Sequence, residues 1–433
     1  MRGERLHIGL MTALGILAAL LFVTSAWAAD PETVLHSFRA SPTTFRYHAG
    51  LDDGWEPFYA NLAMDAAGNL YGTTWGGGIF NYGTIFKLTR TNGGWTESVL
   101  FAFGYDYNTG HYPSGGLTLD AAGNLYGTTT GGGEYNSGIV FELVNNGDGT
   151  WTEQVLHNFD NTDGFGPDAT LIFDSSGNLY GTTGGGGAYQ NGTAFELTPT
   201  GGGNWSETVL HSFGNGTDGV SPMSPLVRDA AGNLYGTTWL GGTHQCGGGG
   251  CGTVFELSPA VGGGWTEQVI HNFSNSGGDG NGPWSGALIF DASGNLYGTT
   301  TTGGAYLCEG GSTGCGTVYE VSPAGDGNWT EQVLYSFNGA GTSGWNLTCS
   351  LLFDAAGNLY GTTYFGGAFE AGAVFELTSS GGVWTEQVLH SFGQGNDGAT
   401  PGAGLIWDAA GNLYGTTLGG GVYGDGTAYE VTP

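Results

Sequence analysis

The sequence predicts an all-β chain folded as a seven-bladed β-propeller with four-stranded blades. Three observations lead to this prediction. A phrase close to Asp-Ala-Ala-Gly-Asn-Leu-Tyr-Gly-Thr-Thr recurs along the chain, and each repeating unit contains four short strand-like runs. In addition, the last unit lacks one of these runs, and a matching run stands near the start of the chain. Radial four-stranded blades account for all three.

The repeated phrase sets the period of the fold. Its Gly-Asn-Leu-Tyr core begins seven times, at spacings of 55, 54, 55, 62, 63 and 54 residues: Gly68, Gly123, Gly177, Gly232, Gly294, Gly357 and Gly411. The unit at 168–213 contains the runs TLIFD, NLYGTT, GTAFELT and WSETVLHSF, separated by Gly, Asn and Asp. Runs this short, without a helical period, indicate strands. Successive side chains of a strand point to opposite faces, so NLYGTT is expected to be buried on both sides.

The two ends of the sequence predict how the ring closes. The seventh unit stops after GTAYEVTP, whereas its missing strand, ETVLHSF, stands at Glu32–Phe38. We expect the strand at 32–38 to complete the final blade and to remove an open sheet edge. The predicted domains are a signal peptide at 1–28 and the propeller at 29–433.

Residues 1–28 have the features of a secretory signal peptide. Arg2 and Arg5 precede an apolar run, and Ala26 and Ala28 form a small-residue cleavage site. The run is too short to favour a membrane anchor. We therefore expect cleavage near Ala28 and a secreted product (extracellular, cell-surface or periplasmic) without membrane insertion. The net charge of −31 argues against nucleic acid as a partner, and a monomer is expected.

Most of the repeated polar residues have a sufficient structural role. The seven Asp residues that open the phrase stand in a turn, where Asp bonds its own following backbone and Gly allows positive φ. The outer-strand histidines share their position with Phe101 and Tyr335, so we interpret that position as aromatic packing. No nucleophile elbow, metalloprotease or phosphate-loop motif was found, so a non-enzymatic chain is expected.

Aromatic residues that break the repeat are the candidate ligand-binding residues. Trp75, Trp239 and Tyr364 follow Gly-Thr-Thr, where other units have Thr, Gly or Leu. Trp55, Trp284 and Trp345 stand in the connections between units, predicted on the same face. Exposed Trp and Tyr stack well on sugar rings and on protein partners. The alternative is that these rings cap the blade core.

No cofactor is expected, and calcium is the alternative. Asp160, Asp163 and Asp168 are the candidate ligands, in the segment DNTDGFGPD. Clustered carboxylates suit calcium, but their spacing does not match an EF-hand loop, and Asp-Gly followed by Pro is ordinary turn chemistry.

Two insertions carry paired cysteines and account for the two longer spacings. Cys246 with Cys251 and Cys308 with Cys315 are expected to form disulfides that close these loops in an exported protein. A zinc site shared by the four thiolates and pairing across the two loops are the open alternatives. Cys349 is left over and expected to be buried.

The full unit, DAAGNLYGTT…GG…GTVFELTP…GGWTEQVLHSF, resembles the Gloeo/Verruco (GloVer) tandem repeat of exported bacterial proteins. The resemblance covers essentially the whole mature chain. It implies a bacterial surface or extracellular protein of a family usually described without an assigned activity. The Asp-x-x-Gly-Asn-Leu-Tyr turn is also similar to sensor-type regulator and streptogramin lyase propellers at the level of fold, which carries no catalysis over.

We therefore expect a secreted, non-enzymatic binding module for a polysaccharide or a protein at the bacterial cell surface. The alternatives are a carbohydrate- or lactone-acting enzyme, a hydrolase or lyase with its site on the same face, and a purely structural envelope component.

Overall fold

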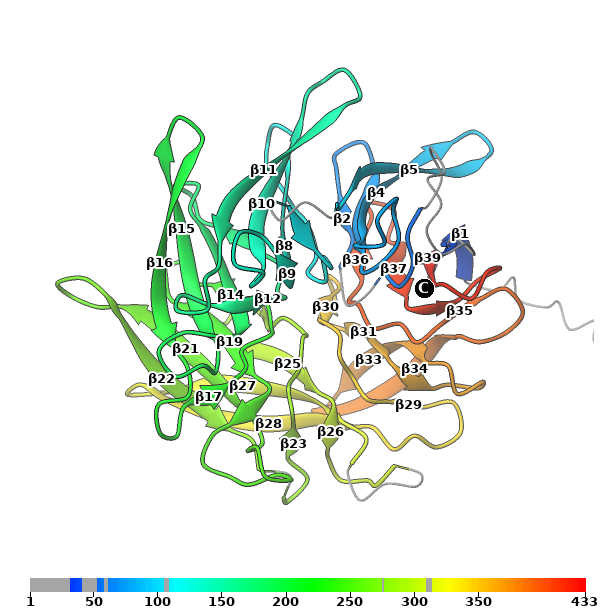
Figure 1. Ribbon diagram of the computed structural model, residues 1–433. Coiled ribbons are helices and arrows are strands. Elements are labelled where there is room, and N and C mark those ends of the chain that lie inside the picture. Colours follow the sequence, from blue (N-terminus) through cyan, green and yellow to red (C-terminus); the bar gives the residue numbers. More distant parts are fainter. Residues whose placement is uncertain (1–31, 41–52, 58–60, 105–108, 275, 309–313) are drawn as a thin grey trace, which may run out of the picture. The chain divides into compact units, whose positions relative to one another are not determined.

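A computed structural model describes residues 32–40, 53–57, 61–104, 109–274, 276–308 and 314–433. In this part of the chain every helix or strand assigned is a β-strand, and seven antiparallel four-stranded sheets form a seven-bladed β-propeller (Figure 1). The predicted fold class is therefore confirmed. The predicted signal peptide lies outside the described residues.

Each blade contains four strands in the order that the repeat predicts, and we number blades 1 to 7 from the innermost strand β2 onward. The innermost strands are short: β2 (Ala63–Met64), β7 (Thr118–Leu119), β13 (Ile172–Phe173), β18 (Val227–Arg228), β24 (Ile289–Phe290), β30 (Leu352–Phe353) and β36 (Ile406–Trp407). The second strands contain the Leu-Tyr-Gly-Thr-Thr phrase: β3 (Leu70–Thr74), β8 (Leu125–Thr129), β14 (Leu179–Gly185), β19 (Leu234–Thr238), β25 (Leu296–Thr300), β31 (Leu359–Thr363) and β37 (Leu413–Thr417).

The third and outer strands form long hairpins. The third strands are β4 (Thr84–Thr91), β10 (Ile139–Asn145), β15 (Thr193–Gly201), β21 (Thr253–Pro259), β27 (Thr317–Gly325), β33 (Ala373–Ser380) and β39 (Thr427–Val431). The outer strands are β5 (Gly94–Ala102), β11 (Trp151–Asn158), β16 (Asn204–Ser212), β22 (Trp265–Asn272), β28 (Asn328–Ser336), β34 (Val383–Ser391) and β1 (Glu32–Ser37).

The N-terminal strand closes the ring. β1 pairs antiparallel with β39, with Glu32 opposite Val431 and Ser37 opposite Thr427. Blade 7 therefore consists of β36, β37, β39 and β1, and Figure 1 shows the blue β1 beside the red β39. This closure gives β39 a partner along the edge that would otherwise be open.

The hydrophobic core is divided among the seven seams between neighbouring blades. At the seam of blades 7 and 1, Leu70 and Phe86 are fully buried together with Tyr414 of the preceding blade. Equivalent clusters occupy the other six seams. Burying each large side chain stabilises the fold by roughly 1.5–3 kcal/mol, so stability is spread evenly around the ring.

The second strand is buried on both faces, as predicted. Leu70 and Tyr71 point to opposite faces, and their exposed fractions are 0% and 4%. The next residue has to be glycine, because a Cβ at Gly72 would lie 2.5 Å from the Phe86 ring. The last threonine of the strand bonds across the sheet, because the hydroxyls of Thr74 and of Thr84, the first residue of β4, are 2.7 Å apart.

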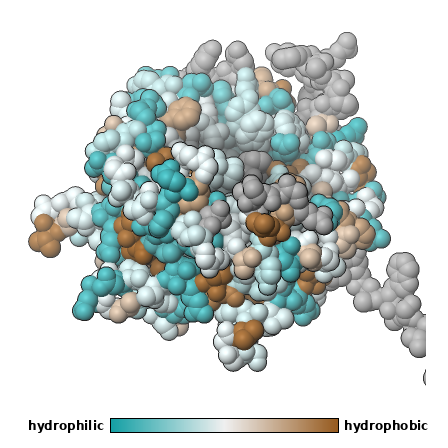
Figure 2. Space-filling model, turned by 90° about the horizontal axis from the view of Figure 1, so that it is seen from below, coloured by the Kyte–Doolittle hydropathy of each residue, from teal (hydrophilic) through white to brown (hydrophobic). Residues whose placement is uncertain are grey.

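On the side of the molecule in Figure 2, hydrophobic residues form small patches separated by hydrophilic ones. Several exposed large hydrophobics lie singly in hairpin loops or at the start of outer strands, such as Val261 and Val383. Single apolar residues of this kind are normal on a soluble surface.

Candidate functional site

One face of the propeller carries two sets of connections, and we call it the loop face. These are the loops from second to third strand and the links from each outer strand to the next blade's innermost strand. The two sets pair as short ladders: β6 (Gly110–His111) with β9 (Gly131–Gly132), β12 (Phe165–Pro167) with β14, β17 (Gly219–Val220) with β20 (Leu240–Gly241), β23 (Gly280–Asn281) with β26 (Thr302–Gly303), β29 (Gly344–Trp345) with β32 (Phe365–Gly366), and β35 (Gly398–Ala399) with β38 (Gly419–Gly420). In blade 1 a single bridge joins Trp55 and Gly76.

Each ladder holds a residue with a left-handed backbone next to a variable residue. The residue four positions into the Asp-Gly link has a left-handed backbone in every blade: Glu56, Tyr112, Gly166, Ser221, Gly282, Asn346 and Thr400, with φ between 52° and 66°. In six blades its carbonyl accepts a hydrogen bond from the residue after Gly-Thr-Thr: Trp75, Thr130, Trp239, Thr301, Tyr364 and Leu418. Left-handed backbone is costly for non-glycine residues and is concentrated at functional sites.

The repeat-breaking aromatics gather in three groups at this face. In the first, the Trp75 ring lies 5.6 Å from Trp55 and stacks on Tyr112 at 4.5 Å. Tyr82 extends the group, because its ring lies 5.6 Å from Tyr112 and stacks on His111 at 4.3 Å. We call these five residues aromatic group 1.

Two smaller groups contain the remaining candidates. Trp239 and Trp284 lie with their rings 4.6 Å apart, as aromatic group 2. Trp345 and Tyr364 both contact the ring of Phe365, at 4.5 Å and 4.6 Å between ring centroids, and the three form aromatic group 3. All six predicted aromatic residues therefore contact another aromatic ring at the loop face.

The rings are held rigidly and remain partly exposed. Nε1 of Trp55 donates to Oδ1 of Asn81 at 2.9 Å, and the ring lies directly on Gly76, where a Cβ would be only 2.3 Å away. Each of the six predicted rings is half-buried, neither a core residue nor freely exposed. A fixed ring with one accessible part loses little conformational freedom when a ligand binds.

The sequence reasoning missed Tyr82, Tyr112 and Phe365 as members of these groups. Tyr112 stands in TGHYP, the copy of the link that departs furthest from Asp-Gly-x-x-Pro, so its deviation from the repeat was the available signal. Phe365 directly follows Tyr364, and Tyr82 lies in a loop of variable sequence. For these two residues only the ladder geometry reveals the contact.

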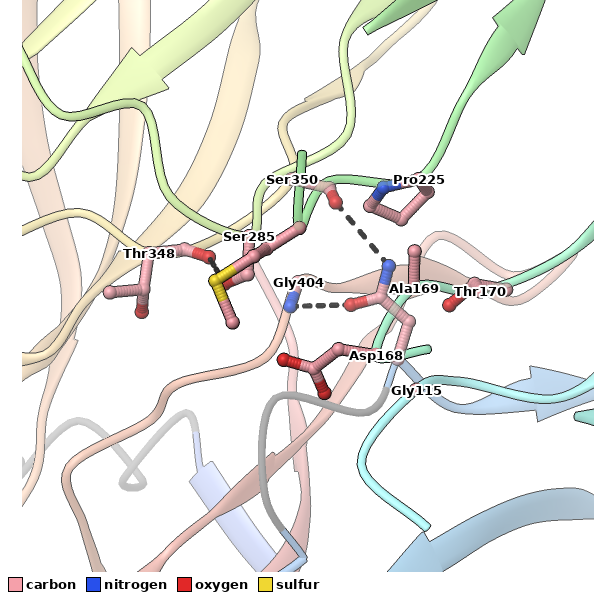
Figure 3. A pocket seen from close by; sticks show the side chains of 11 residues that line it. Gly115, Asp168, Ala169, Thr170, Pro225, Ser285, Thr348, Ser350 and Gly404 are labelled. Carbon is pink, nitrogen blue, oxygen red and sulfur yellow. Dashed lines mark hydrogen bonds between the residues drawn. The ribbon is translucent and has the colours of Figure 1, made fainter. Parts of the chain in front are cut away.

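The axis of the propeller is lined by residues from all seven blades, and polar side chains come from blades 1, 3, 5 and 6. Figure 3 shows Asp168, Thr170, Ser285, Thr348 and Ser350 around this axial cavity. Asn61 closes it from blade 1: its Oδ1 accepts from the Gly404 N–H at 2.7 Å, and its Nδ2 donates to Ser350 Oγ at 3.4 Å. The Ser114 hydroxyl donates to the Asp168 carboxylate, whose pKa is raised by burial.

The size of this cavity decides what it can hold. Its solvent volume is about 10 Å³, about the smallest space that accommodates one water molecule. A sugar ring does not fit there. The axial Asp168 is therefore not placed to act on a bound saccharide in this conformation.

The three calcium candidates do not form one site. Asp163 Oδ1 accepts from the Asp160 N–H at 2.9 Å, while its Oδ2 lies 2.9 Å from His157 Nε2. Asp160 Oδ1 accepts from the Thr162 amide and hydroxyl. Asp168 lies instead at the axis, bonded to Ser114.

The repeated Asp of DAAGN acts in its turn, as predicted. Asp65 Oδ1 accepts from the amides of Ala67 and Asn69, both at 2.9 Å, and Oδ2 accepts from the Asn69 side chain at 2.8 Å and the Tyr71 hydroxyl at 3.0 Å. Burial acts to raise the pKa of Asp65, but these hydrogen bonds outweigh it and lower the pKa. Equivalent bonds occur in the other blades, so this carboxylate is structural.

The cysteines pair within each loop. Cys246 bonds to Cys251 and Cys308 to Cys315, while Cys349 is a buried free thiol. Two disulfides fit an extracellular protein. Among the described residues no helix is long and apolar enough to cross a membrane.

Two solved structures share the fold. A protein from Lactobacillus plantarum is 16% identical with a TM-score of 0.51, and the match covers 77% of this chain and 84% of that one. The polysaccharide lyase Uly1 is 11% identical with a TM-score of 0.51, and the match covers 94% and 98%. At these identities the likeness shows the fold alone. Among curated proteins, none matches the sequence.

The repeat itself identifies the family. The family model described as the Gloeobacter/Verrucomicrobia repeat matches residues 23–171 and 243–433, which together are most of the chain. These two regions include the turn, the second strand and the outer strand on which the resemblance rested. The chain belongs to the Gloeobacter/Verrucomicrobia repeat family.

Proposed function

We propose that this protein is a secreted, non-enzymatic binding module that holds a polysaccharide on its loop face. The observation that carries the proposal is the grouping of all six repeat-breaking aromatics into three ring clusters at that face. The rest of the scaffold is copied from blade to blade, so these rings distinguish one blade from another.

The chemistry of the groups suits a saccharide. The faces of sugar rings carry C–H groups that pack on Trp and Tyr, and a ring held by its neighbours keeps its orientation. Several platforms on one face let a polymer engage at more than one point, which raises its overall affinity. The net charge of −31 repels acidic polymers, so a neutral glycan is the expected ligand class.

The enzyme alternative has one observation in its favour: the carboxylate of Asp168 lies at the axis, and burial raises its pKa. Against it, the axial cavity has only about 10 Å³ of solvent space. No described residue brings a second carboxylate into that cavity, although glycoside hydrolysis usually needs a pair. The binding proposal is therefore preferred.

The test is retention of the mature protein on a panel of insoluble and immobilised neutral and acidic polysaccharides. Trp75→Ala, Trp239→Ala and Trp345→Ala each remove one ring from one of the three groups. Each loss is expected to weaken binding about 2- to 10-fold, since an aromatic contact contributes roughly 0.5–1.5 kcal/mol. The triple variant should lose retention altogether.

Phe165→Ala is the matched control, because Phe165 is a 46% exposed aromatic of the same face outside the three groups. It should bind as wild type does. If wild type is retained on no glycan, the carbohydrate proposal fails, and a protein partner becomes the occupant to test. If the triple variant binds undiminished, the aromatic groups are not the site.

A further inference from the structure

The outer seams between blades carry a recurrent trio of side chains. A histidine on one outer strand faces an aspartate from the following link and a glutamate on the next blade's outer strand. Five seams have the trio: His36, Asp53 and Glu97; His157, Asp163 and Glu207; His211, Asp218 and Glu267; His271, Asp279 and Glu331; and His390, Asp397 and Glu32.

The remaining two seams show that the histidine position also has a packing role. There Phe101 and Tyr335 replace histidine, and the Tyr335 hydroxyl donates to Glu386 at 3.0 Å. Like the histidines, both rings lie edge-on to the phenylalanine two residues later. A phenyl ring is thus compatible with the fold at this position.

In four of the five trios the histidine is already engaged. Its Nε2 lies 2.8 to 3.1 Å from the aspartate, a normal hydrogen bond, in the pairs His36–Asp53, His157–Asp163, His211–Asp218 and His390–Asp397. The histidine and the aspartate of these four trios therefore satisfy each other, although Oε1 of Glu97, Glu207 and Glu267 makes no hydrogen bond.

The seam of blades 4 and 5 differs. His271 Nε2 is buried, makes no hydrogen bond and lies 3.6 Å from Asp279 Oδ1. Asp279 is turned toward its own link instead, accepting at 2.9 Å from both the amide and the hydroxyl of Ser274. A buried ring nitrogen without a partner is costly, because it has lost its water.

A second unsatisfied atom faces it across the seam. Glu331 Oε1 is buried and makes no hydrogen bond, and it lies with His271 Nε2 and Asp279 within 4.8 Å of one another. An imidazole nitrogen and a glutamate oxygen, both without hydrogen bonds, therefore converge on the Asp279 carboxylate, whose Oδ1 also accepts from the Gly280 N–H at 2.6 Å.

We propose that His271, Asp279 and Glu331 bind one divalent first-row transition ion of the Zn²⁺ type, which joins blades 4 and 5. One imidazole nitrogen and two carboxylate oxygens suit such an ion, whereas Ca²⁺ prefers oxygen ligands alone. Zinc bonds of about 2.0–2.2 Å in tetrahedral geometry put neighbouring donors roughly 3.4 Å apart. The 3.6 Å between His271 and Asp279 is close to that spacing.

The test is an isothermal calorimetric titration of the chelator-treated mature protein with Zn²⁺. A parallel titration with Ca²⁺ tests the specificity for the metal. One Zn²⁺ per chain should bind at micromolar concentration or tighter, raise the melting temperature by several degrees, and be displaced by EDTA. His271→Phe, which copies the residue found at Phe101, should lose at least 100-fold in affinity. Glu331→Gln removes one ligand charge and should weaken binding by at least tenfold.

His211→Phe is the matched control, because His211 already bonds its aspartate at 3.1 Å. It should leave the single ion in place. Circular dichroism establishes whether each variant folds. If His271→Phe does not fold, the Zn²⁺ affinity of Glu331→Gln decides whether this seam is the site. The proposal is overturned if wild type binds no Zn²⁺, or if both seam variants bind it as tightly as wild type. These readouts are independent of glycan binding.

Discussion

The main-chain N–H of Trp75 donates a 2.9 Å hydrogen bond to the carbonyl of Glu56, whose φ is 52°. A repeat-breaking aromatic residue is thus held by a residue in a strained backbone conformation. Because the bond recurs in five further blades, the loop face presents variable side chains on a fixed backbone pattern. Function can diverge at these positions while the repeat is kept.

The strain at these positions is measurable. Ser221 has φ of 56°, so Ser221→Gly should raise the free energy of unfolding by about 0.5–1 kcal/mol, because glycine adopts this conformation without a Cβ clash. Gly166→Ala, at φ of 61°, should lower it by about 1 kcal/mol. Urea unfolding curves measure both. A loss of stability in Ser221→Gly would contradict the argument.

A buried hydroxyl offers a second route to higher stability. Tyr319 is fully buried and its hydroxyl makes no hydrogen bond, whereas five other blades have phenylalanine there. Tyr319→Phe should stabilise the protein by about 1 kcal/mol, since the cost of the unpaired hydroxyl disappears. The converse change in blade 6, Phe375→Tyr, should destabilise it. Thermal unfolding of both variants checks the two predictions. Melting temperatures that shift in the same direction in both variants would refute them.

The seam glutamates predict a dependence of stability on pH. Burial raises the pKa of Glu97 and of Glu207 to about 7, from an ordinary value near 4.5. The folded state therefore holds these protons more tightly than the unfolded state does. Their contribution to stability is complete below pH 4.5 and is lost as the pH rises through 7.

Urea unfolding at pH 4.5, 6 and 8 tests this dependence. The wild type should become less stable across this range, and Glu207→Gln, which cannot ionise, should decline less. Glu134→Gln, at an exposed loop residue, serves as control. Parallel curves for wild type and Glu207→Gln would show that Glu207 does not titrate in this window.

Thiol counting tests the cysteine arrangement. With Cys246–Cys251 and Cys308–Cys315 bonded and Cys349 buried, the native protein should expose no reactive thiol, and the denatured, unreduced protein should expose one. Cys246→Ser with Cys251→Ser removes a loop with a separation of five residues. Loss of that loop should cost roughly 2 kcal/mol. A native thiol count above zero would contradict the pairing.

Deletion of residues 32–38 from the mature protein tests ring closure. The shortened chain leaves β39 with an open edge and removes Leu35 and Phe38 from the seam core. Loss of these two buried side chains alone should cost roughly 5 kcal/mol or more, and the open edge favours association. Thermal unfolding and size-exclusion chromatography measure the two effects. A monomer of unchanged stability would show that β1 is dispensable.

Most of the fold could be predicted because every blade repeats the same physical problem. The Asp65 turn, the doubly buried Leu70 and Tyr71, and the pairing of β1 with β39 all follow from local chemistry and the position of the missing strand. The ladders between links and loops could not be predicted. Their strands are two or three residues long, and their pairing depends on the tertiary arrangement of the blades.

The candidate site was predictable only in part. Deviation from the repeat located Trp75 and Trp239, because a substitution in a copied scaffold is visible in the sequence itself. The difference between His271 and the other seam histidines was not visible. It arises from a shift of less than 1 Å between His271 and Asp279, in a motif whose residue types are the same as in the other trios.

The joining of β1 to β39 also has a consequence for biogenesis. Glu32 is among the first residues of the propeller to be synthesised, and its partner Val431 is among the last. The ring therefore cannot be sealed until β39 has been synthesised. Until then, the nascent chain must keep six complete blades in solution while the edge of blade 6 and strand β1 remain unpaired with blade 7. The blades carry few charges and only scattered apolar residues on their surface, which suits this incomplete state. Pairing of β39 with β1 then converts an extendable array of blades into a closed, discrete particle.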